Sequence, residues 1–187
     1  HDVKADHGRP LSLASAAPDN GPSGLPSGRN YSFDYGDAHF TIIDSNEDAQ
    51  TLRARTRPWL ERDLAAAKRR WKFVFLHHPP FSSGRHGSSK KVQSALVPTF
   101  QRMKVNLVFA GHDHDYERFR PINGVTYVVS GDGGAGLYRF EKTHAASVRR
   151  ANRRHGLTMV SVDGGRLELK HLAADSSVLD QFQMMVG

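Results

Sequence analysis

The stretch Val105-Asn106-Leu107-Val108-Phe109-Ala110 is followed directly by Gly111-His112-Asp113-His114. Its apolar residues have the length and the β-branched content of a buried strand. Gly111 lets the backbone turn tightly after this strand, so two imidazoles two residues apart can reach one crevice. Because neutral imidazole binds Zn, Fe, Mn and similar ions, the stretch predicts a strand that ends in a metal site.

A second apolar run, Trp71-Lys72-Phe73-Val74-Phe75-Leu76, also ends in histidine, at His77-His78-Pro79-Pro80. Pro79 biases His78 toward an extended conformation and prevents the strand from continuing. Ligands of open α/β sheets bind at the carboxyl ends of the strands. We therefore expect the two runs to deliver their histidines to one site.

The composition is that of a single globular domain. The chain has 187 residues, of which 38% are hydrophobic, and this is enough to form a core. It has no cysteine, which excludes disulfides and thiolate ligands. No apolar stretch reaches the length of a membrane span, and no signal peptide is visible in this chain.

The net charge of +7 favours anionic ligands such as phosphate esters, nucleic acid or acidic lipid. The positive residues concentrate in three clusters, at 53–57, 68–70 and 149–154. Few aromatic residues are interleaved with them to stack bases. This pattern favours solvated helix faces and a loop over a nucleic-acid groove.

The periodicity along the chain predicts an α/β (α+β) fold in one domain, residues 1–187, with a loop-rich lead-in over residues 1–30. The Gly-rich run at 131–136 lacks the Gly-Lys-Ser/Thr of a phosphate-binding P-loop, which favours a close-approach turn beside the site.

Besides the two strands that end in histidine, the sequence predicts the following elements in chain order: a β-hairpin in 31–43, a helix over 48–70 in which Pro58 fits the start, a loop at 78–90, a helix over about 91–103, a strand at 125–130, a basic excursion at 141–155, a hairpin over 157–172 and a last strand at 178–185.

Two blocks of these residues resemble motifs of the calcineurin-like metallophosphoesterases. Val74-Phe75-Leu76-His77 is similar to their Val-x-x-His block, and Gly111-His112-Asp113-His114 to their Gly-His-x-His block. The wider similarity, from about Tyr31 to the end, is to the purple acid phosphatase branch. It is carried by Tyr31-Ser32-Phe33-Asp34-Tyr35-Gly36, Trp59-Leu60-Glu61, His77-His78-Pro79-Pro80-Phe81-Ser82-Ser83, His114-Asp115-Tyr116-Glu117-Arg118, Gly131-Asp132-Gly133-Gly134 and Val178-Leu179-Asp180-Gln181-Phe182.

The resemblance implies a β-sandwich flanked by helices, of which this chain is the C-terminal part, with two metal ions (Fe, Zn, Mn or Mg) at the strand ends. By the resemblance, His77 and His112 bind one ion and His114 binds the other. His1 matches the catalytic histidine that acts as an acid and contacts phosphate. His86 either contacts substrate phosphate or is a solvent-exposed loop residue, and His78 is expected to pack beside the ligands or support them.

Three blocks that carry most of the family's oxygen ligands precede the matched region, and only His1-Asp2 resembles the tail of one of them. The N-terminal half of the domain is therefore expected to be absent, disordered or on another chain. The resemblance implies hydrolysis of phosphate monoesters or diesters by the intact protein, in an extracellular or periplasmic location, with the isolated chain binding metal weakly and nearly inert. The alternatives are a non-catalytic interaction module and a basic nucleic-acid-binding domain.

Overall fold

The computed structural model describes residues 16–187, which contain two sheets and a small set of helices. From residue 16 to residue 30 the chain forms turns and bends. The strands are β1 (Tyr31–Tyr35), β2 (Ala38–Ile43), β3 (Trp71–Leu76), β4 (Leu107–Ala110), β5 (Tyr116–Phe119), β6 (Thr126–Ser130), β7 (Ser147–Ala151), β8 (Gly156–Asp163), β9 (Arg166–Ala173) and β10 (Val178–Met185). The helices are α2 (Ala49–Thr51), the π-helical turn η2 (Leu52–Thr56), α3 (Arg57–Ala66) and α4 (Lys90–Arg102).

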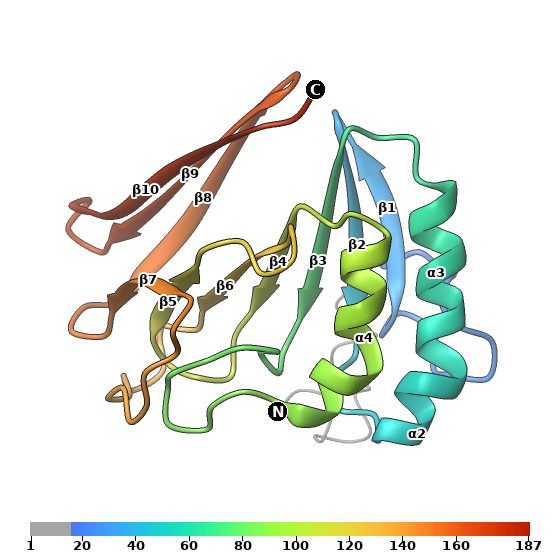
Figure 1. The fold of residues 1–187 in the computed structure, drawn as a ribbon, viewed down its shortest axis with the longest axis horizontal. Helices are drawn as coiled ribbons and strands as arrows, with labels where there is room; N and C mark the ends of the chain where they lie inside the picture. Colours follow the sequence, from blue (N-terminus) through green and yellow to red (C-terminus); the bar gives the residue numbers. More distant parts are fainter. Residues whose placement is uncertain (1–15) are drawn as a thin grey trace.

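The strands form a seven-stranded mixed sheet, ordered β1-β2-β3-β4-β6-β5-β7, and a three-stranded antiparallel sheet, ordered β10-β9-β8. Helices α3 and α4 cover one face of the large sheet, and the small sheet lies on its other side (Figure 1). This arrangement confirms the predicted β-sandwich flanked by helices. None of the helices in residues 16–187 is long and apolar enough to cross a membrane.

The parallel pairing in the middle of the large sheet positions the site. Strand β3 pairs in parallel with β4, in a register that places Leu76 opposite Ala110. These are the last residues of the two strands, so the histidines that follow them leave the sheet at the same edge. The expectation that both strands serve one site is confirmed at the level of the backbone.

The predicted helix over 48–70 is present from Ala49 to Ala66, so it begins where predicted and ends before residue 70, and Pro58 stands at the start of α3 as predicted. The segment begins at Asp48, whose side chain accepts hydrogen bonds from the backbone N–H groups of Gln50 and Thr51. Pro58 lies inside the segment, in the first turn of α3. It is tolerated there because the π-helical turn η2 directly precedes it and relaxes the regular hydrogen bonding that a proline would break.

Two strands were not predicted. Strand β7 lies in the stretch expected to be a basic excursion, because its exposed Arg149 and Arg150 hide the alternation of an edge strand. Strand β5 follows the histidine motif directly, and its charged Glu117 and Arg118 made it look polar. Glu117 is nevertheless fully buried.

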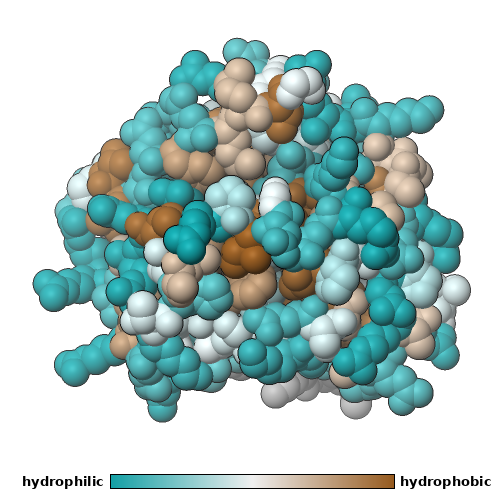
Figure 2. Space-filling view, in the orientation of Figure 1, coloured by the Kyte–Doolittle hydropathy of each residue, from teal (hydrophilic) through white to brown (hydrophobic). Residues whose placement is uncertain are grey.

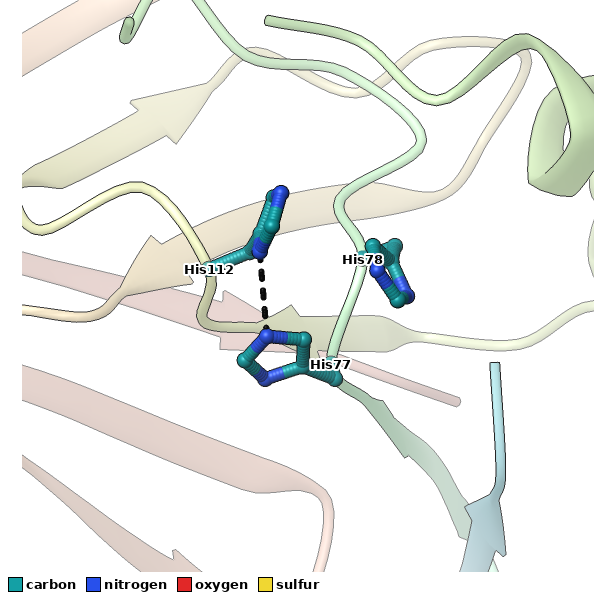
Figure 3. Close-up of side chains that lie close together, drawn as sticks. All are labelled: His77, His78 and His112. Carbon is teal, nitrogen blue, oxygen red and sulfur yellow. Dashed lines mark hydrogen bonds between the residues drawn. The ribbon is translucent and has the colours of Figure 1, made fainter. Parts of the chain in front are cut away.

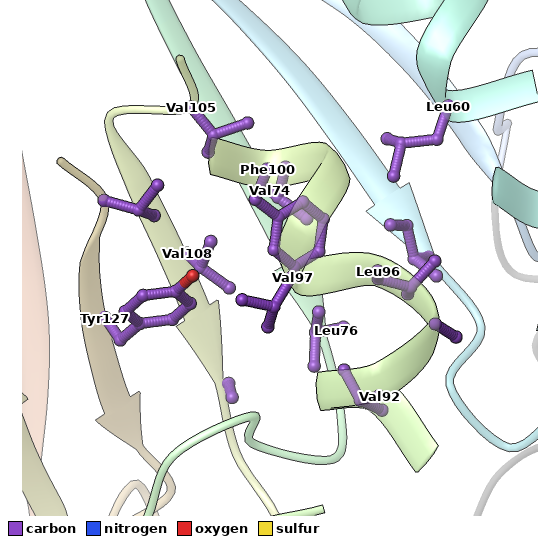
Figure 4. Close-up of a cluster of buried hydrophobic side chains, with 14 of the residues drawn as sticks. Leu60, Val74, Leu76, Val92, Leu96, Val97, Phe100, Val105, Val108 and Tyr127 are labelled. Atoms are coloured by element: carbon purple, nitrogen blue, oxygen red, sulfur yellow. The ribbon is translucent and has the colours of Figure 1, made fainter. Parts of the chain in front are cut away.

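The main core lies between the helices and the large sheet. Leu60 of α3, together with Leu96 and Phe100 of α4, is fully buried against Val74 of β3 and Val108 of β4 (Figure 4). These apolar contacts fix α4 over the strands that carry the histidines. The loop that connects β3 to α4 is thereby held at both ends.

The small sheet is joined to the large one by buried polar contacts. The carboxylate of Asp180 accepts hydrogen bonds from the Tyr116 hydroxyl at 2.7 Å and from Arg118 Nε at 2.6 Å and Nη2 at 3.0 Å. His171 Nε2 donates to Asp132 at 2.8 Å, and both side chains are fully buried. Because an unpaired buried charge is costly, these pairs fix where the two sheets meet.

An apolar cleft of about 660 Å³ opens between the two sheets. Phe40, Phe73, Phe75 and Phe109 line it from the large sheet, and β8 lines it from the small one. Figure 2, in the orientation of Figure 1, shows a largely hydrophilic surface, with hydrophobic side chains between hydrophilic ones near its middle. The cleft extends to Gly111, which directly precedes His112.

The core packing predicts a large cost for removing one α4 side chain. Leu96→Ala should lower the free energy of unfolding by about 2–5 kcal/mol, because Leu96 is fully buried and the change leaves a cavity. Chemical denaturation measures this cost. Ser94→Ala, on the exposed side of the same helix, should change it by less than about 0.5 kcal/mol, and equal effects would contradict the assigned packing.

Candidate metal centre

Three imidazoles gather where β3 and β4 end. Nε2 of His77 and Nδ1 of His112 lie 3.0 Å apart and share a hydrogen bond. His78 joins them, and each of the three rings offers a ligand nitrogen within 4.8 Å of the others. Figure 3 shows the rings of His77 and His112 meeting between the two strand ends, with His78 beside them. The predicted convergence of His77 and His112 is therefore present.

The geometry of this pair fits a metal ion. Two nitrogens that each bind one ion at about 2.1 Å, at right angles, lie about 3 Å apart, which is close to the observed separation. His112 also has a left-handed backbone, with φ of +67°. A residue other than glycine rarely adopts this conformation, and such strain clusters at functional sites.

His78 is held by Ser45, which follows β2. The Ser45 hydroxyl accepts a hydrogen bond from the His78 backbone N–H at 2.9 Å and also contacts Nδ1 of the ring at 2.9 Å. A hydrogen bond of this kind fixes the orientation of the imidazole ring, whether the ring binds a metal ion or supports a residue that does. The position of His78 beside His77 and His112 agrees with the expectation that it packs beside the ligands or supports them.

His114 lies outside the group formed by His77, His78 and His112. Its Nδ1–H donates to the carbonyl oxygen of Gly136 at 2.8 Å, and its ring stacks on Tyr138 with centroids 4.1 Å apart. This leaves Nε2 as the nitrogen available to an ion, with the ring orientation fixed by its other hydrogen bond. Binding of a second ion requires that His114 lie apart from the other three histidines, as it does here. The binding of an ion by His114 stays a prediction.

His86 faces the group from the loop after β3. Its ring centroid lies 4.3 Å from that of His112, and its Nδ1–H donates to Asp113 Oδ1 at 3.0 Å. Its side chain is 41% exposed, so it is accessible to a ligand. Both alternatives for His86, a substrate contact and a solvent-exposed loop residue, therefore stay predictions. His1, the predicted catalytic histidine, lies outside the described residues.

The environment keeps two of these imidazoles neutral. Burial, and then the neighbouring imidazoles of His86 and His77, lowers the pKa of His112 to about 4. Burial, and then His112 and His77, lowers the pKa of His78 to about 4. Neutral imidazole is the form that binds a metal ion, so the group is prepared for a cation at neutral pH.

The fully buried Asp113 organises the site, although the sequence did not indicate it. Its carboxylate accepts hydrogen bonds from the Ser82 hydroxyl, the backbone N–H groups of His86 and Gly87, and the His86 ring. A Cβ on Gly84 would lie 2.5 Å from Asp113 Cγ, so this close approach requires glycine. The presence of an acidic residue between two histidines was the signal in the sequence that could have indicated its role.

Further buried carboxylates interact with Asp113. Asp115, Glu117 and Asp132 are fully buried, and both carboxylate oxygens of Asp115 have no partner among the described residues. Burial, followed by the charges of Asp113, Glu117 and Asp132, raises the pKa of Asp115 to about 8. This environment favours the protonated form of the Asp115 carboxyl at neutral pH.

The Gly-rich run approaches these residues closely. A Cβ on Gly131 would lie 2.1 Å from the carbonyl oxygen of Asp113. Only glycine fits there, which confirms the predicted close-approach turn at that position.

Replacing the Asp113 carboxylate should release the loop. Asp113→Asn removes a charged acceptor and presents an amide to N–H donors, at a cost of about 1.5–3 kcal/mol. The amides of His86 and Gly87 should exchange hydrogen at least about tenfold faster. Asp175→Asn, which disturbs a comparable turn on the small sheet, should leave both rates unchanged. Unchanged exchange in Asp113→Asn would refute the anchoring role.

Asp115 should make the stability of the fold depend on pH. Its folded-state pKa of about 8 exceeds the ordinary 3.8, so the folded chain keeps a proton that the unfolded chain loses between these values. Its contribution to stability therefore falls as the pH rises across that window, by at most about 1.4 kcal/mol per pH unit. The melting temperature of Asp115→Asn relative to the parent should rise from pH 5 to pH 8. Parallel curves, like those expected for the exposed Asp163→Asn, would contradict this.

Comparisons with known proteins agree with this geometry. The chain is 35% identical over 116 residues to purple acid phosphatase 21 of Arabidopsis thaliana, a match that covers 56% of the chain and 26% of that protein. It is 38% identical over 81 residues to tartrate-resistant acid phosphatase type 5 of Rattus norvegicus, covering 43% of the chain and 25% of that protein. The chain thus spans about a quarter of the length of the curated relatives it matches.

Among solved structures, the purple acid phosphatase PPD1 from yellow lupin (Lupinus luteus) seeds superimposes with a TM-score of 0.81. That match has 25% identity and covers 98% of this chain and 36% of that one. The family model described as calcineurin-like phosphoesterase matches residues 4–116, which include both strands and all the histidines of the site from His77 to His114. The chain belongs to the calcineurin-like phosphoesterase family.

Proposed function

We propose that this chain contributes the imidazole ligands of a binuclear metal centre that hydrolyses phosphate esters. The observation that carries the proposal is the pairing of His77 Nε2 with His112 Nδ1 at 3.0 Å. His114 supports it, because its Nδ1 is hydrogen-bonded and its Nε2 remains available for a second ion. Imidazole ligands suit Zn, Fe and Mn, and Mg belongs to the same set of candidate ions.

In this proposal each residue has a defined task. His77 and His112 hold one ion and His114 holds the other. When bound, the ions stabilise charge on the phosphoryl oxygens and lower the pKa of the attacking water. His86 contacts the phosphate through Nε2, while Asp113 fixes its ring through Nδ1. By resemblance, His1 protonates the leaving oxygen.

The carboxylate ligands, including the one that bridges the ions, are proposed to come from a segment outside these 187 residues. Two observations support this. The candidate metal group found in residues 16–187 consists of imidazoles only. The relatives also extend far beyond the matched region. Such a segment would act as the partner of this chain, and the chain by itself would bind metal weakly.

An extracellular or periplasmic location belongs to the same proposal, because the matched relatives are acid phosphatases of the purple acid type. The nucleic-acid-binding alternative has less support. Among the clustered arginines, Arg149 donates to the Leu179 carbonyl oxygen, and Arg154 pairs with Asp175 and Ser177. These contacts give the two arginines structural tasks.

The reaction can be tested on the 187-residue chain and on a longer form that includes the preceding part of the domain. The longer form should hydrolyse p-nitrophenyl phosphate or bis-p-nitrophenyl phosphate when Zn, Fe, Mn or Mg is added, whereas the 187-residue chain should be nearly inert. His112→Ala should abolish turnover in the longer form, because it removes one ligand of the pair. Elemental analysis of both forms should find tightly held metal only in the longer one.

Two results would count against the proposal. Robust turnover by the 187-residue chain, lost in His112→Ala, would show that the carboxylates need not come from outside. A correctly folded longer form without metal-dependent turnover would favour the non-catalytic interaction module. His155→Ala is a suitable control, because that ring contacts the Asp132 carbonyl oxygen and has no proposed ligand role.

A further inference from the structure

His39 of β2 lies between two carboxylates, away from the histidines of the candidate metal centre. Its Nδ1 is 2.8 Å from Oδ1 of Asp34, which is its register partner on β1. Its Nε2 is 3.0 Å from Oδ2 of Asp63, which belongs to α3. The ring is buried. One imidazole therefore joins the β1–β2 hairpin, at the edge of the large sheet, to the helix beside it (Figure 1).

Both contacts of this ring are hydrogen bonds only when the ring is charged. An ionised carboxylate accepts hydrogen bonds and donates none, so a ring nitrogen that faces one must carry a proton. Neutral imidazole has one N–H group, whereas imidazolium has two. The geometry around His39 thus fits an imidazolium. A neutral ring would turn a nitrogen lone pair toward the oxygen of Asp34 or of Asp63.

The two carboxylates differ in how firmly their surroundings hold them. Besides His39, Asp63 accepts hydrogen bonds from the Ser32 hydroxyl at 2.5 Å and from the Thr41 hydroxyl at 3.0 Å. The side chain of Asp63 is 12% exposed, while that of Asp34 is 41% exposed and can be hydrated. Loss of one ring proton should therefore open the contact between Nδ1 and Asp34 and keep the contact between Nε2 and Asp63.

The other charged groups around the ring leave this preference in place. Arg69, which follows α3, donates through Nε to Oδ2 of Asp34 at 3.0 Å. Lys72 of β3 pairs in register with His39, but its Nζ donates to the carbonyl oxygens of Leu64 and Met103. Burial lowers the pKa of His39, but the hydrogen bonds to Asp63 and Asp34 outweigh burial and raise the pKa above its ordinary value of 6.5.

We propose that His39 is a pH-operated clamp, which holds the β1–β2 hairpin against α3 when the ring is protonated and releases β1 when the ring loses a proton. Among the described residues β1 has only β2 as a strand neighbour, so it is the element that this release would loosen. The proposal does not depend on the proposed function, because none of the candidate metal ligands takes part in the clamp.

The direction of the effect follows from the charge that the fold favours. Because the folded chain binds the proton of His39 more tightly than the unfolded chain does, the clamp contributes fully below the unfolded pKa of about 6.5. That contribution is lost as the pH rises through the higher pKa of the folded state. The β1 edge should accordingly be firm in mild acid and loose in mild alkali.

A titration of the histidine ring signals by NMR, with His39 assigned from the spectrum of His39→Gln, tests the charge of the ring. The midpoint of His39 should lie above 6.5, and Asp34→Asn should lower it by about one pH unit. Asp34→Glu, which keeps the carboxylate, should retain most of the parent value. Asp37→Asn is the matched control, because it removes an exposed acid from the turn of the same hairpin and should leave the midpoint unchanged.

Amide hydrogen exchange, corrected for its intrinsic dependence on pH, tests the release of the strand. Protection of the β1 amides relative to those of β4 should fall at least about tenfold from pH 5.5 to pH 8.5. In Asp34→Asn the relative protection should be low at both pH values, while Asp37→Asn should behave like the parent. A midpoint of His39 at or below 6.5, an equal lowering in Asp37→Asn, or relative protection of β1 that is constant with pH would overturn the clamp.

Discussion

The carboxylate of Asp113 is the interaction on which the site depends. It is fully buried and lies between the two histidines of the second strand, where it accepts hydrogen bonds from Ser82, His86 and Gly87 of the loop that follows the first strand. Parallel pairing of β3 and β4 brings the two loops to one edge, but it does not fix how they face each other. Asp113 supplies that second constraint, and it does so at the cost of a charge kept away from water.

The electrostatics of the site combine buried carboxylates with imidazoles. Asp113 and Asp115 are fully buried, and burial keeps the neighbouring imidazoles of His78 and His112 neutral. A group of neutral imidazoles can accept a metal ion without first releasing protons, which favours binding at neutral pH. The buried Asp113 carboxylate favours positive charge at the neighbouring His112.

The elements closest to the chemistry were predictable from the sequence, because they have the strongest patterns. Strands β3 and β4 are mainly apolar runs followed by Gly or Pro beside histidine, so their type and their meeting point could be predicted. Strand β7 could not, because it lies at a sheet edge where arginines are as suitable as apolar residues. The close-approach turn at Gly131 was predicted from composition, but its contact with the Asp113 backbone depends on the tertiary fold.

The roles of individual side chains were harder to predict than the strands. Nothing local in the sequence indicates that Asp113 accepts hydrogen bonds from residues about 30 positions earlier, or that Ser45 holds His78. The resemblance to a family identified His77, His112 and His114 as ligands, and the structure adds that the first two face each other while the third is oriented separately. Their binding of metal stays a prediction.

The apolar cleft between the sheets has a thermodynamic consequence. The heat capacity of unfolding comes mainly from apolar surface that is dry in the folded state and becomes hydrated on unfolding. Phenyl rings such as those of Phe40 and Phe109, which line a cleft of about 660 Å³ and are only partly buried, contribute less to that change than fully buried rings would. The stability curve of this chain is accordingly flatter with temperature than that of a closed sandwich of equal length.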